Sequence, residues 1–126
     1  MAEELRQLEY SQRLLRQARN VLARPGQSNG RALFDAAVTG GSIALGAGVG
    51  GLAAGAPADF VSLDAAHPSL SGKTGDAILD AWIFANGTRV DRVWVRGKKL
   101  VEGGRHKRGD AIAKRFRKAM MELTAG

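Results

Sequence analysis

The spacing of apolar residues changes near the middle of the chain, and this change limits the folds that the sequence can form. Before a Gly- and Ala-rich stretch, Gly46 to Gly55, apolar residues recur at three- and four-residue intervals, which is typical of amphipathic helices. After it, short apolar runs lie between turn-forming residues, which is typical of strands. Helical spacing returns from Asp110 onward. We therefore predict an α+β fold in the order helix, helix, several strands, helix.

Two helices are expected before the Gly-rich stretch. The first runs from Glu3 to Ala23, carries leucines seven residues apart at positions 8, 15 and 22, and ends at Arg24-Pro25-Gly26. The second runs from 31 to 38, with Ser28 or Asn29 as its cap. Residues 39–41 (Thr-Gly-Gly) are expected to break this helix, and Ser42 is expected to cap one further turn through residue 45.

Strands are expected in the second half of the chain. They are predicted at 58–64, 81–85, 90–95 and 98–101. Residues 76–80 are expected to form one helical turn, and turns are expected at Asn86-Gly87, Arg96-Gly97 and Gly103-Gly104. The last helix is predicted from Asp110, as its N-cap, to about Leu123, and we expect it to dock on the sheet.

The net charge of +7 comes from the C-terminal third of the chain. Residues 89–118 hold twelve Lys or Arg against Asp91, Glu102 and Asp110. A basic surface can bind nucleic acid, but single-strand binders also expose aromatic rings for stacking. We expect Trp94 and Phe116 to be buried, so nucleic acid is not the expected partner, and a small basic binding module remains the alternative hypothesis.

Composition excludes several other classes. No apolar run reaches the roughly 20 residues of a membrane helix, and residues 1–24 lack the apolar stretch of a signal peptide. We therefore expect no membrane partner and a cytoplasmic location. The absence of cysteine excludes disulfides and thiolate metal ligands.

No motif in the chain predicts a catalytic, cofactor-binding or metal-binding residue. Gly46-x-Gly48-x-x-Gly51 has the dinucleotide-binding spacing, but the expected helix before it and strand after it are in the wrong order. His67 and His106 are the only histidines, whereas a catalytic zinc needs about three protein ligands. Serines such as 42 and 62 lack a nucleophile-elbow motif. Asp76 and Asp80 are spaced for one helical face, where capping and surface roles are more common than acid–base catalysis.

Two stretches resemble the amidohydrolase superfamily. Residues 51–64 (GLAAGAPADFVSLD) resemble the return from its barrel to its small β-sandwich, and residues 93–104 (VWVRGKKLVEGG) resemble the closing hairpin of that sandwich. Residues 3–10 (EELRQLEY), 76–85 (DAILDAWIFA) and 104–117 are most similar to formimidoylglutamate deiminase.

The resemblance implies a C-terminal fragment of a longer enzyme. Residues 1–50 would be terminal helices of a (β/α)8 barrel, 51–104 part of a composite β-sandwich, and 105–126 a C-terminal helix. The family hydrolyses the formimino C–N bond of N-formimidoyl-L-glutamate in histidine breakdown, using a zinc ion whose ligands would precede Glu3. The resemblance therefore implies no cofactor in this chain, no activity by itself, and as partner either the missing barrel or a second copy in a homo-oligomer.

Overall fold

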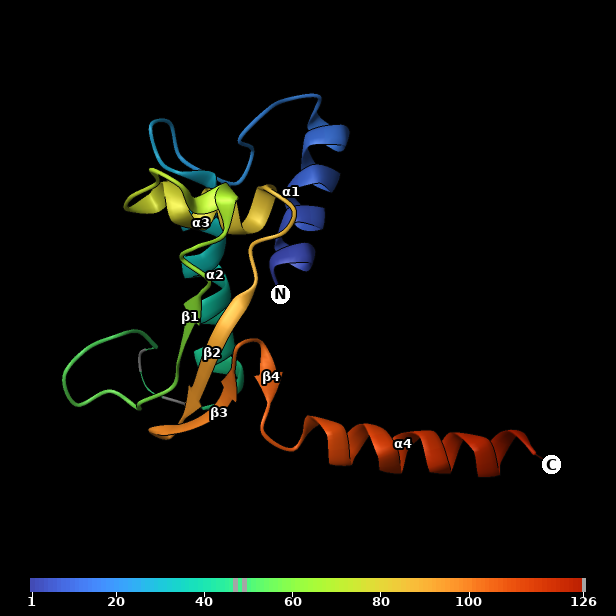
Figure 1. Ribbon diagram of the computed structural model, residues 1–126. Coiled ribbons are helices and arrows are strands. Elements are labelled where there is room, and N and C mark those ends of the chain that lie inside the picture. Colours follow the sequence, from blue (N-terminus) through green and yellow to red (C-terminus); the bar gives the residue numbers. More distant parts are fainter. Residues whose placement is uncertain (47, 49, 126) are drawn as a thin grey trace. The chain divides into compact units, whose positions relative to one another are not determined.

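The computed structural model of the chain describes residues 1–46, 48 and 50–125 (Figure 1). These residues form two compact units, and each is described by itself. Unit 1 comprises Met1–Pro57 and Asp64–Arg89, and it is helical. Unit 2 comprises Ala58–Leu63 and Val90–Gly126, and it holds a four-stranded sheet and the last helix. This content confirms the predicted α+β class.

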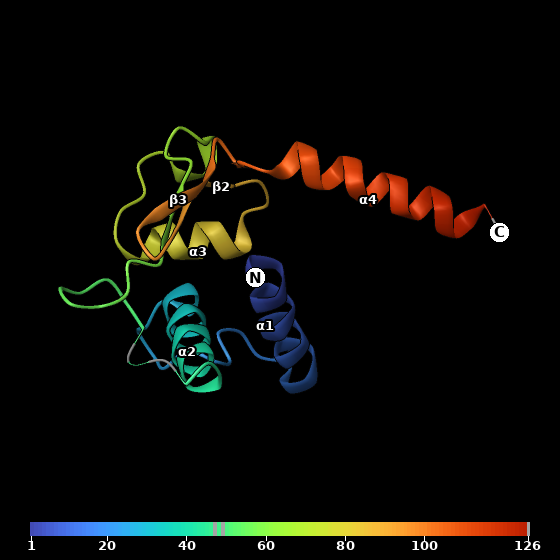
Figure 2. The ribbon, with the colours of Figure 1, turned by 90° about the horizontal axis from the view of Figure 1, so that it is seen from below.

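The core of unit 1 is formed by three helices. They are α1 (Ala2–Arg16), α2 (Asn29–Ala44) and α3 (Asp76–Phe84). Both views show α3 lying across the other two (Figures 1 and 2). Leu5, Leu33 and Ile83 contribute one buried side chain from each helix, and Trp82 and Phe84 pack against them. A one-turn 3₁₀ helix, Pro68–Leu70, precedes α3 and adds the buried Leu70.

Helix α1 ends seven residues before the predicted end at Ala23. Gln17 adopts the left-handed conformation, with φ of 48°, and donates its N–H to the carbonyl of Arg13. The cause is a tertiary contact, because the Glu9 carboxylate accepts a hydrogen bond from the backbone N–H of Val21 at 3.2 Å. This bond turns the chain back beside α1, so Leu22 does not extend the helical stripe.

Helix α2 is continuous where the sequence predicted a break. The predicted cap is confirmed, because Ser28 Oγ accepts a hydrogen bond from the N–H of Arg31 at 3.0 Å. Gly40, Gly41 and Ser42 all lie inside the helix, which continues to Ala44. A glycine in a helix costs only about 1 kcal/mol relative to alanine, which an already nucleated helix can absorb.

Helix α3 replaces both the single turn and the strand predicted at 76–85. Its nine residues form one helix in which Ala81 and Ile83 are buried. A short apolar run has no periodicity that separates a buried helix from a buried strand. Packing decides here, because the helix brings Ile83 against Leu33 and places Asp80 at the start of α2. Asn86-Gly87 forms a turn as predicted, but it follows a helix.

The sheet of unit 2 is an antiparallel meander in the order β1-β2-β3-β4. Its strands are β1 (Phe60–Leu63), β2 (Val90–Val95), β3 (Lys98–Glu102) and β4 (Arg105–His106). The prediction for β2 is confirmed residue for residue, and β3 is one residue longer than predicted. Arg96 and Gly97 both have positive φ, at 49° and 72°, as a two-residue hairpin turn requires. The two-residue β4 was not predicted.

The last helix, α4 (Gly109–Thr124), confirms the predicted helix within about a residue at each end. Asp110 is not its N-cap; that position is Arg108, and Asp110 instead accepts hydrogen bonds from Arg105 at 3.0 and 3.2 Å. No α4 residue is buried, so the predicted docking of this helix on the sheet is wrong for the structure described. Among the described helices, none combines the length and the apolar character needed to cross a membrane.

Candidate functional site

An apolar groove lies between α1 and α2 in unit 1. Its volume is about 350 Å³, and it is lined by leucine and alanine side chains, which are Leu5, Leu8, Leu22, Ala32, Leu33, Ala36 and Ala37. Leu8 and Leu22 remain 48% and 38% exposed at its rim. Of the three leucines whose spacing predicted a long amphipathic helix, Leu8 lines the groove from α1 and Leu22 from the segment after α1, whereas Leu15 is 77% exposed and is not among the lining residues.

The chemistry of the groove selects an apolar partner. Its volume lies at the lower end of the range for small-molecule pockets, but such pockets also carry a few polar groups that orient the ligand. Leucine and alanine side chains supply no such group. A groove of this kind is suited to another protein surface, whose apolar side chains would be removed from water by packing there.

A buried carboxylate, that of Glu9, lies one turn after Leu5 on α1. Glu9 is fully buried, and its Oε1 accepts hydrogen bonds from Arg13 Nε at 2.9 Å and from the N–H of Val21 at 3.2 Å. Burial raises the pKa of Glu9, but the bond from Arg13, the nearby amide of Asn29 and the Val21 N–H together hold that pKa below its usual value. The Asn29 amide makes no hydrogen bond of standard geometry with the carboxylate, and Glu9 Oε2 has no partner among the described residues.

Sequence reasoning missed this cluster. No role in a site was predicted for Glu9 from the sequence. The four-residue spacing of Glu9 and Arg13 was a signal for an ion pair, because such residues are neighbours on a helix. Nothing in the sequence indicated the contact with Val21.

Asp76 and Asp80 have structural partners. Asp80 Oδ1 accepts a hydrogen bond from the N–H of Gly30 at 2.7 Å, which satisfies a free donor in the first turn of α2. Asp76 Oδ1 accepts one from Arg31 Nε at 2.9 Å. Both carboxylates thus tie α3 to the N-terminus of α2.

The two histidines have different structural roles and lie far apart in the sequence. His67 caps the 3₁₀ helix, and its Nδ1 lies 2.8 Å from Ser69 Oγ. His106 is exposed in β4, and its Nδ1 accepts a hydrogen bond from the N–H of Arg108 at 3.1 Å. Over residues 1–46, 48 and 50–125, no three His, Asp or Glu side chains gather in a way that could hold a metal ion. The described residues therefore offer no set of side chains that fits a catalytic zinc.

The remaining sequence motifs acquire no chemistry. Gly46, Gly48 and Gly51 follow α2 and precede β1, the reverse of the order that dinucleotide binding needs, and positions 47 and 49 lie outside the described residues. Ser62 Oγ is buried without a partner among the described atoms. It lies in β1, and no histidine is within that strand.

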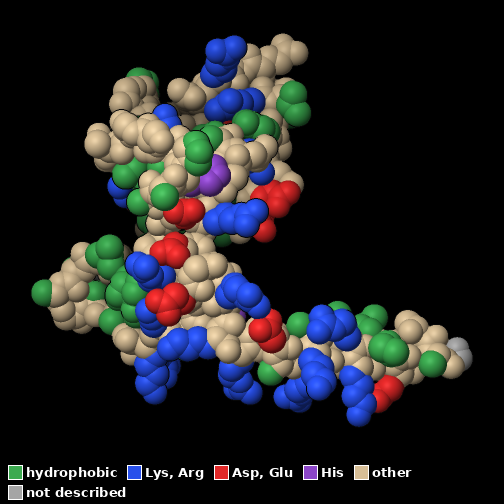
Figure 3. Space-filling model, viewed as in Figure 1, with side chains coloured by type: hydrophobic (Ala, Val, Ile, Leu, Met, Phe, Trp, Pro, Cys, Tyr) green, Lys and Arg blue, Asp and Glu red, His purple; other side chains and the backbone are tan. Residues whose placement is uncertain are grey.

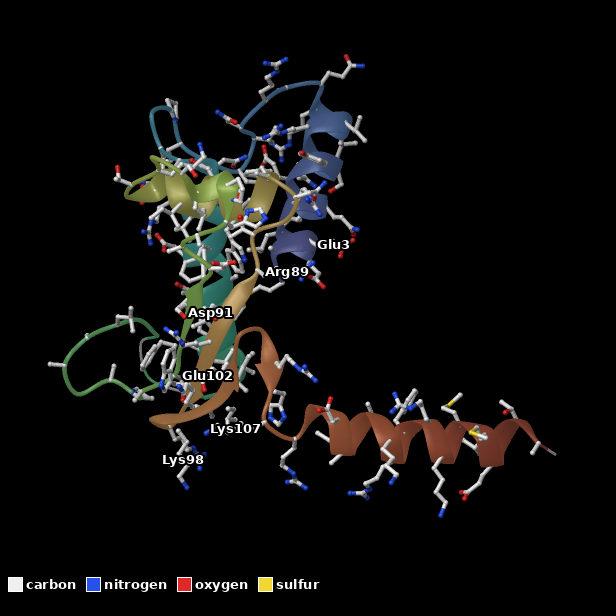
Figure 4. The ribbon with its side chains drawn as sticks, viewed as in Figure 1. Glu3, Arg89, Asp91, Lys98, Glu102 and Lys107 are labelled. Atoms are coloured by element: carbon white, nitrogen blue, oxygen red, sulfur yellow. The ribbon has the colours of Figure 1, made fainter. Side chains whose placement is uncertain are left out.

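The basic residues of unit 2 are partly paired. Lys99 donates a hydrogen bond to Glu102 and holds the pKa of that carboxyl below its usual value. Both residues lie in β3, and Glu102 is near Lys98 and Lys107 (Figure 4). Trp94 is half-buried and stacks on Phe60, with ring centroids 4.6 Å apart. Phe116 is 63% exposed, so the prediction that it is buried is wrong.

Comparison with known proteins identifies long relatives. No family model matches the chain. Over 125 residues, 98% of its length, the chain is 46% identical to a formimidoylglutamate deiminase from Pseudomonas aeruginosa and covers 28% of that protein. A crystal structure of an amidohydrolase from Brucella melitensis matches with a TM-score of 0.90 and 57% identity, over 98% of this chain and 27% of the other. The chain thus spans about a quarter of the length of these relatives. The resemblance predicted from the sequence is confirmed, and the chain corresponds over almost its whole length to part of an amidohydrolase.

Proposed function

We propose that this chain is the C-terminal part of a cytoplasmic formimidoylglutamate deiminase of the histidine degradation route. The 46% identity over 98% of the chain to such a deiminase is the observation that carries the proposal. In this reaction water adds to the formimino carbon of N-formimidoyl-L-glutamate, the C–N bond to the terminal nitrogen breaks, and ammonia leaves. N-formyl-L-glutamate remains.

In this proposal the chain supports the fold of the enzyme, and the zinc ligands come from the part of the (β/α)8 barrel that the rest of the protein forms. Two observations favour this division. The described residues contain no cluster suited to a metal, and the relatives have roughly three times as much additional chain. The groove between α1 and α2 offers the barrel an apolar contact surface, and burying it would stabilise the assembly by about 25 cal/mol per Å².

Complementation tests this proposal. The Pseudomonas aeruginosa deiminase is produced without the stretch that this chain matches, alone and together with the chain, and ammonia release from N-formimidoyl-L-glutamate is measured. We expect activity only when both polypeptides are present. Activity of the chain alone would contradict the proposal. So would a lack of activity in a mixture in which both polypeptides are soluble and folded.

A pair of variants on α1 tests the role of the groove. Leu8→Glu places a charge on the groove rim, so it should reduce the recovered activity at least tenfold. Leu14→Glu adds the same charge to the same helix at a side chain that is 81% exposed and outside the groove, so it should leave recovery unchanged. Equal recovery with both variants would show that the groove does not bind the barrel.

A small basic binding module is the second candidate, and the exposure of Phe116 favours it. This ring lies between Arg115 and Arg117, and single-strand binders combine exposed aromatics with basic side chains. A filter-binding titration with single-stranded DNA at increasing salt separates the candidates. Tight binding that falls steeply with salt would support the module, whereas weak binding supports the deiminase proposal.

A further inference from the structure

Helix α4 exposes a continuous apolar stripe. At 100° per residue, Ile112, Phe116, Ala119 and Leu123 fall within a narrow sector of the helix surface, with Met120 beside them. Phe116 is 63% and Leu123 78% exposed. Figure 3 shows hydrophobic side chains gathered along one side of this helix and most of its Lys and Arg along the other. The spacing of four, three and four residues is the a/d pattern by which two helices pack.

We propose that α4 binds α4 of a second copy of this chain, antiparallel, about a two-fold axis. In this pairing Ile112 faces Leu123 of the second copy, and Phe116 faces Ala119. Each large ring is then opposite a methyl group, which is how side chains from two helices interdigitate without voids. The two-fold axis repeats every contact, so the apolar stripe is covered along its full length.

Charge complementarity favours the same arrangement. Arg115 and Glu122 flank the stripe on one side, and antiparallel pairing brings each beside the other residue of the second copy. Glu122 has only an exposed partner within its own helix, Lys118 at 3.7 Å, and such surface pairs contribute little. In the described part of the chain, Arg115 has no carboxylate within ion-pair distance.

A parallel pair does not have this complementarity. In a parallel pair in register, Phe116 would face Phe116 of the second copy and Ala119 would face its Ala119. The phenylalanine layer would then be overpacked, and the alanine layer beside it would contain a void. Arg115 would lie beside Met120 of the second copy, without a carboxylate. A contact between two single helices buries less surface than a standard protein interface of about 1,600 Å². We therefore expect a dissociation constant in the micromolar range. This proposal rests on α4 alone and does not depend on the deiminase proposal.

Sedimentation velocity over a series of protein concentrations measures the pairing. We expect a reversible dimer for the unaltered chain. Arg115→Glu and Glu122→Arg should each weaken it by about tenfold, because each substitution turns two symmetry-related attractions into repulsions. The double variant carrying both substitutions should restore the affinity to within about threefold. Arg117→Glu is the matched control, since it makes the same charge change away from the stripe and should leave the affinity unchanged.

The result that overturns the proposal is equally specific. A chain that stays monomeric at all concentrations has no such pairing, and its exposed stripe then serves another partner. A dimer that is indifferent to both charge substitutions but is lost with Leu8→Glu would place the contact at the groove of unit 1. Helix content measured by circular dichroism verifies that each variant keeps its fold, which we expect because no residue of α4 is buried.

Discussion

Glu9 is the one fully buried charged side chain among the described residues, and replacing it tests the packing of unit 1. Glu9→Gln keeps the shape of the side chain and one acceptor oxygen but removes the charge. The substitution weakens the bond from Arg13 and places an amide where the carboxylate now accepts the N–H of Val21. We expect unit 1 to lose stability, because this single carboxylate holds both the end of α1 and the segment that follows it.

The expected loss is about 2–3 kcal/mol. Hydrogen bonds to charged groups contribute about 1.5–3 kcal/mol each, and glutamine retains part of one of them. Breaking a fully buried ion pair costs about 3–5 kcal/mol, but the Arg13 side chain is 30% exposed and can regain water. The lower range therefore applies.

The pH dependence of stability gives an independent test. Burial opposes the charged form and is the largest single effect, but the Arg13 bond, the nearby Asn29 amide and the Val21 N–H together keep the folded-state pKa of Glu9 below the ordinary value of 4.5. A carboxyl whose pKa is lower in the folded state stabilises the fold fully above the ordinary value. That contribution is lost as the pH falls through the lower, folded-state pKa. The stability difference between the unaltered chain and Glu9→Gln should therefore be constant near neutrality and shrink below about pH 4.5.

Urea denaturation followed by circular dichroism, at pH values from 7 to 3, measures these differences. Glu3→Gln is the matched control, because Glu3 is exposed in the first turn of the same helix and its loss should cost under about 1 kcal/mol. If Glu9→Gln lies within 0.5 kcal/mol of the unaltered chain (about the spread of ordinary surface substitutions), the carboxylate does not hold the two segments together. A stability difference that does not begin to shrink between pH 4.5 and pH 3 would refute the pKa argument.

Three further outcomes are expected of the same chain. Ile83→Ala removes a side chain that is 1% exposed and should cost about 3 kcal/mol in urea denaturation, whereas Ile43→Ala, 76% exposed, should cost under about 0.5 kcal/mol. Gly30→Ala places a Cβ 2.6 Å from the Asp80 backbone nitrogen, so this substitution should lower the melting temperature. The Cβ of Gly40→Ala meets nothing within 4 Å, so that substitution should increase the stability by up to about 1 kcal/mol and raise the melting temperature. Elemental analysis of the purified chain should find no stoichiometric zinc, and one tightly held zinc per chain would contradict the division of roles proposed for the barrel.

The predictable part of the fold is the part fixed by local rules. The strand at Val90–Val95 and the turn at Arg96-Gly97 were predictable because a hairpin turn and an apolar run specify each other over a few residues. The Ser28 cap was predictable for the same reason, since its bond to the N–H of Arg31 spans three residues. The apolar residues of helix α4 keep helical spacing along most of its length, so its bounds were predicted to within one or two residues.

The failures arise where a distant residue decides the structure. The early end of α1 depends on the bond from Val21 to Glu9, and no spacing rule gives a bond across twelve residues. The helical form of residues 81–84 depends on Ile83 packing against Leu33, fifty residues earlier in the chain. The candidate site follows the same division, because the buried position of Glu9 depends on its contact with the distant Val21 and could not be predicted from the sequence.

The two apolar surfaces of this chain differ in how they arise, and this difference makes them separable by experiment. The groove of unit 1 lies beside a core that is already closed by Leu33 and Ile83, so a charge at Leu8 should change binding without unfolding the helices. The stripe of α4 has no core beside it, because no residue of that helix is buried. A partner that covers the groove therefore adds to a formed structure, whereas a partner that covers α4 supplies the helix with its only apolar contacts. In sedimentation velocity we therefore expect dimerisation to be weakened by Arg115→Glu and unaffected by Leu8→Glu.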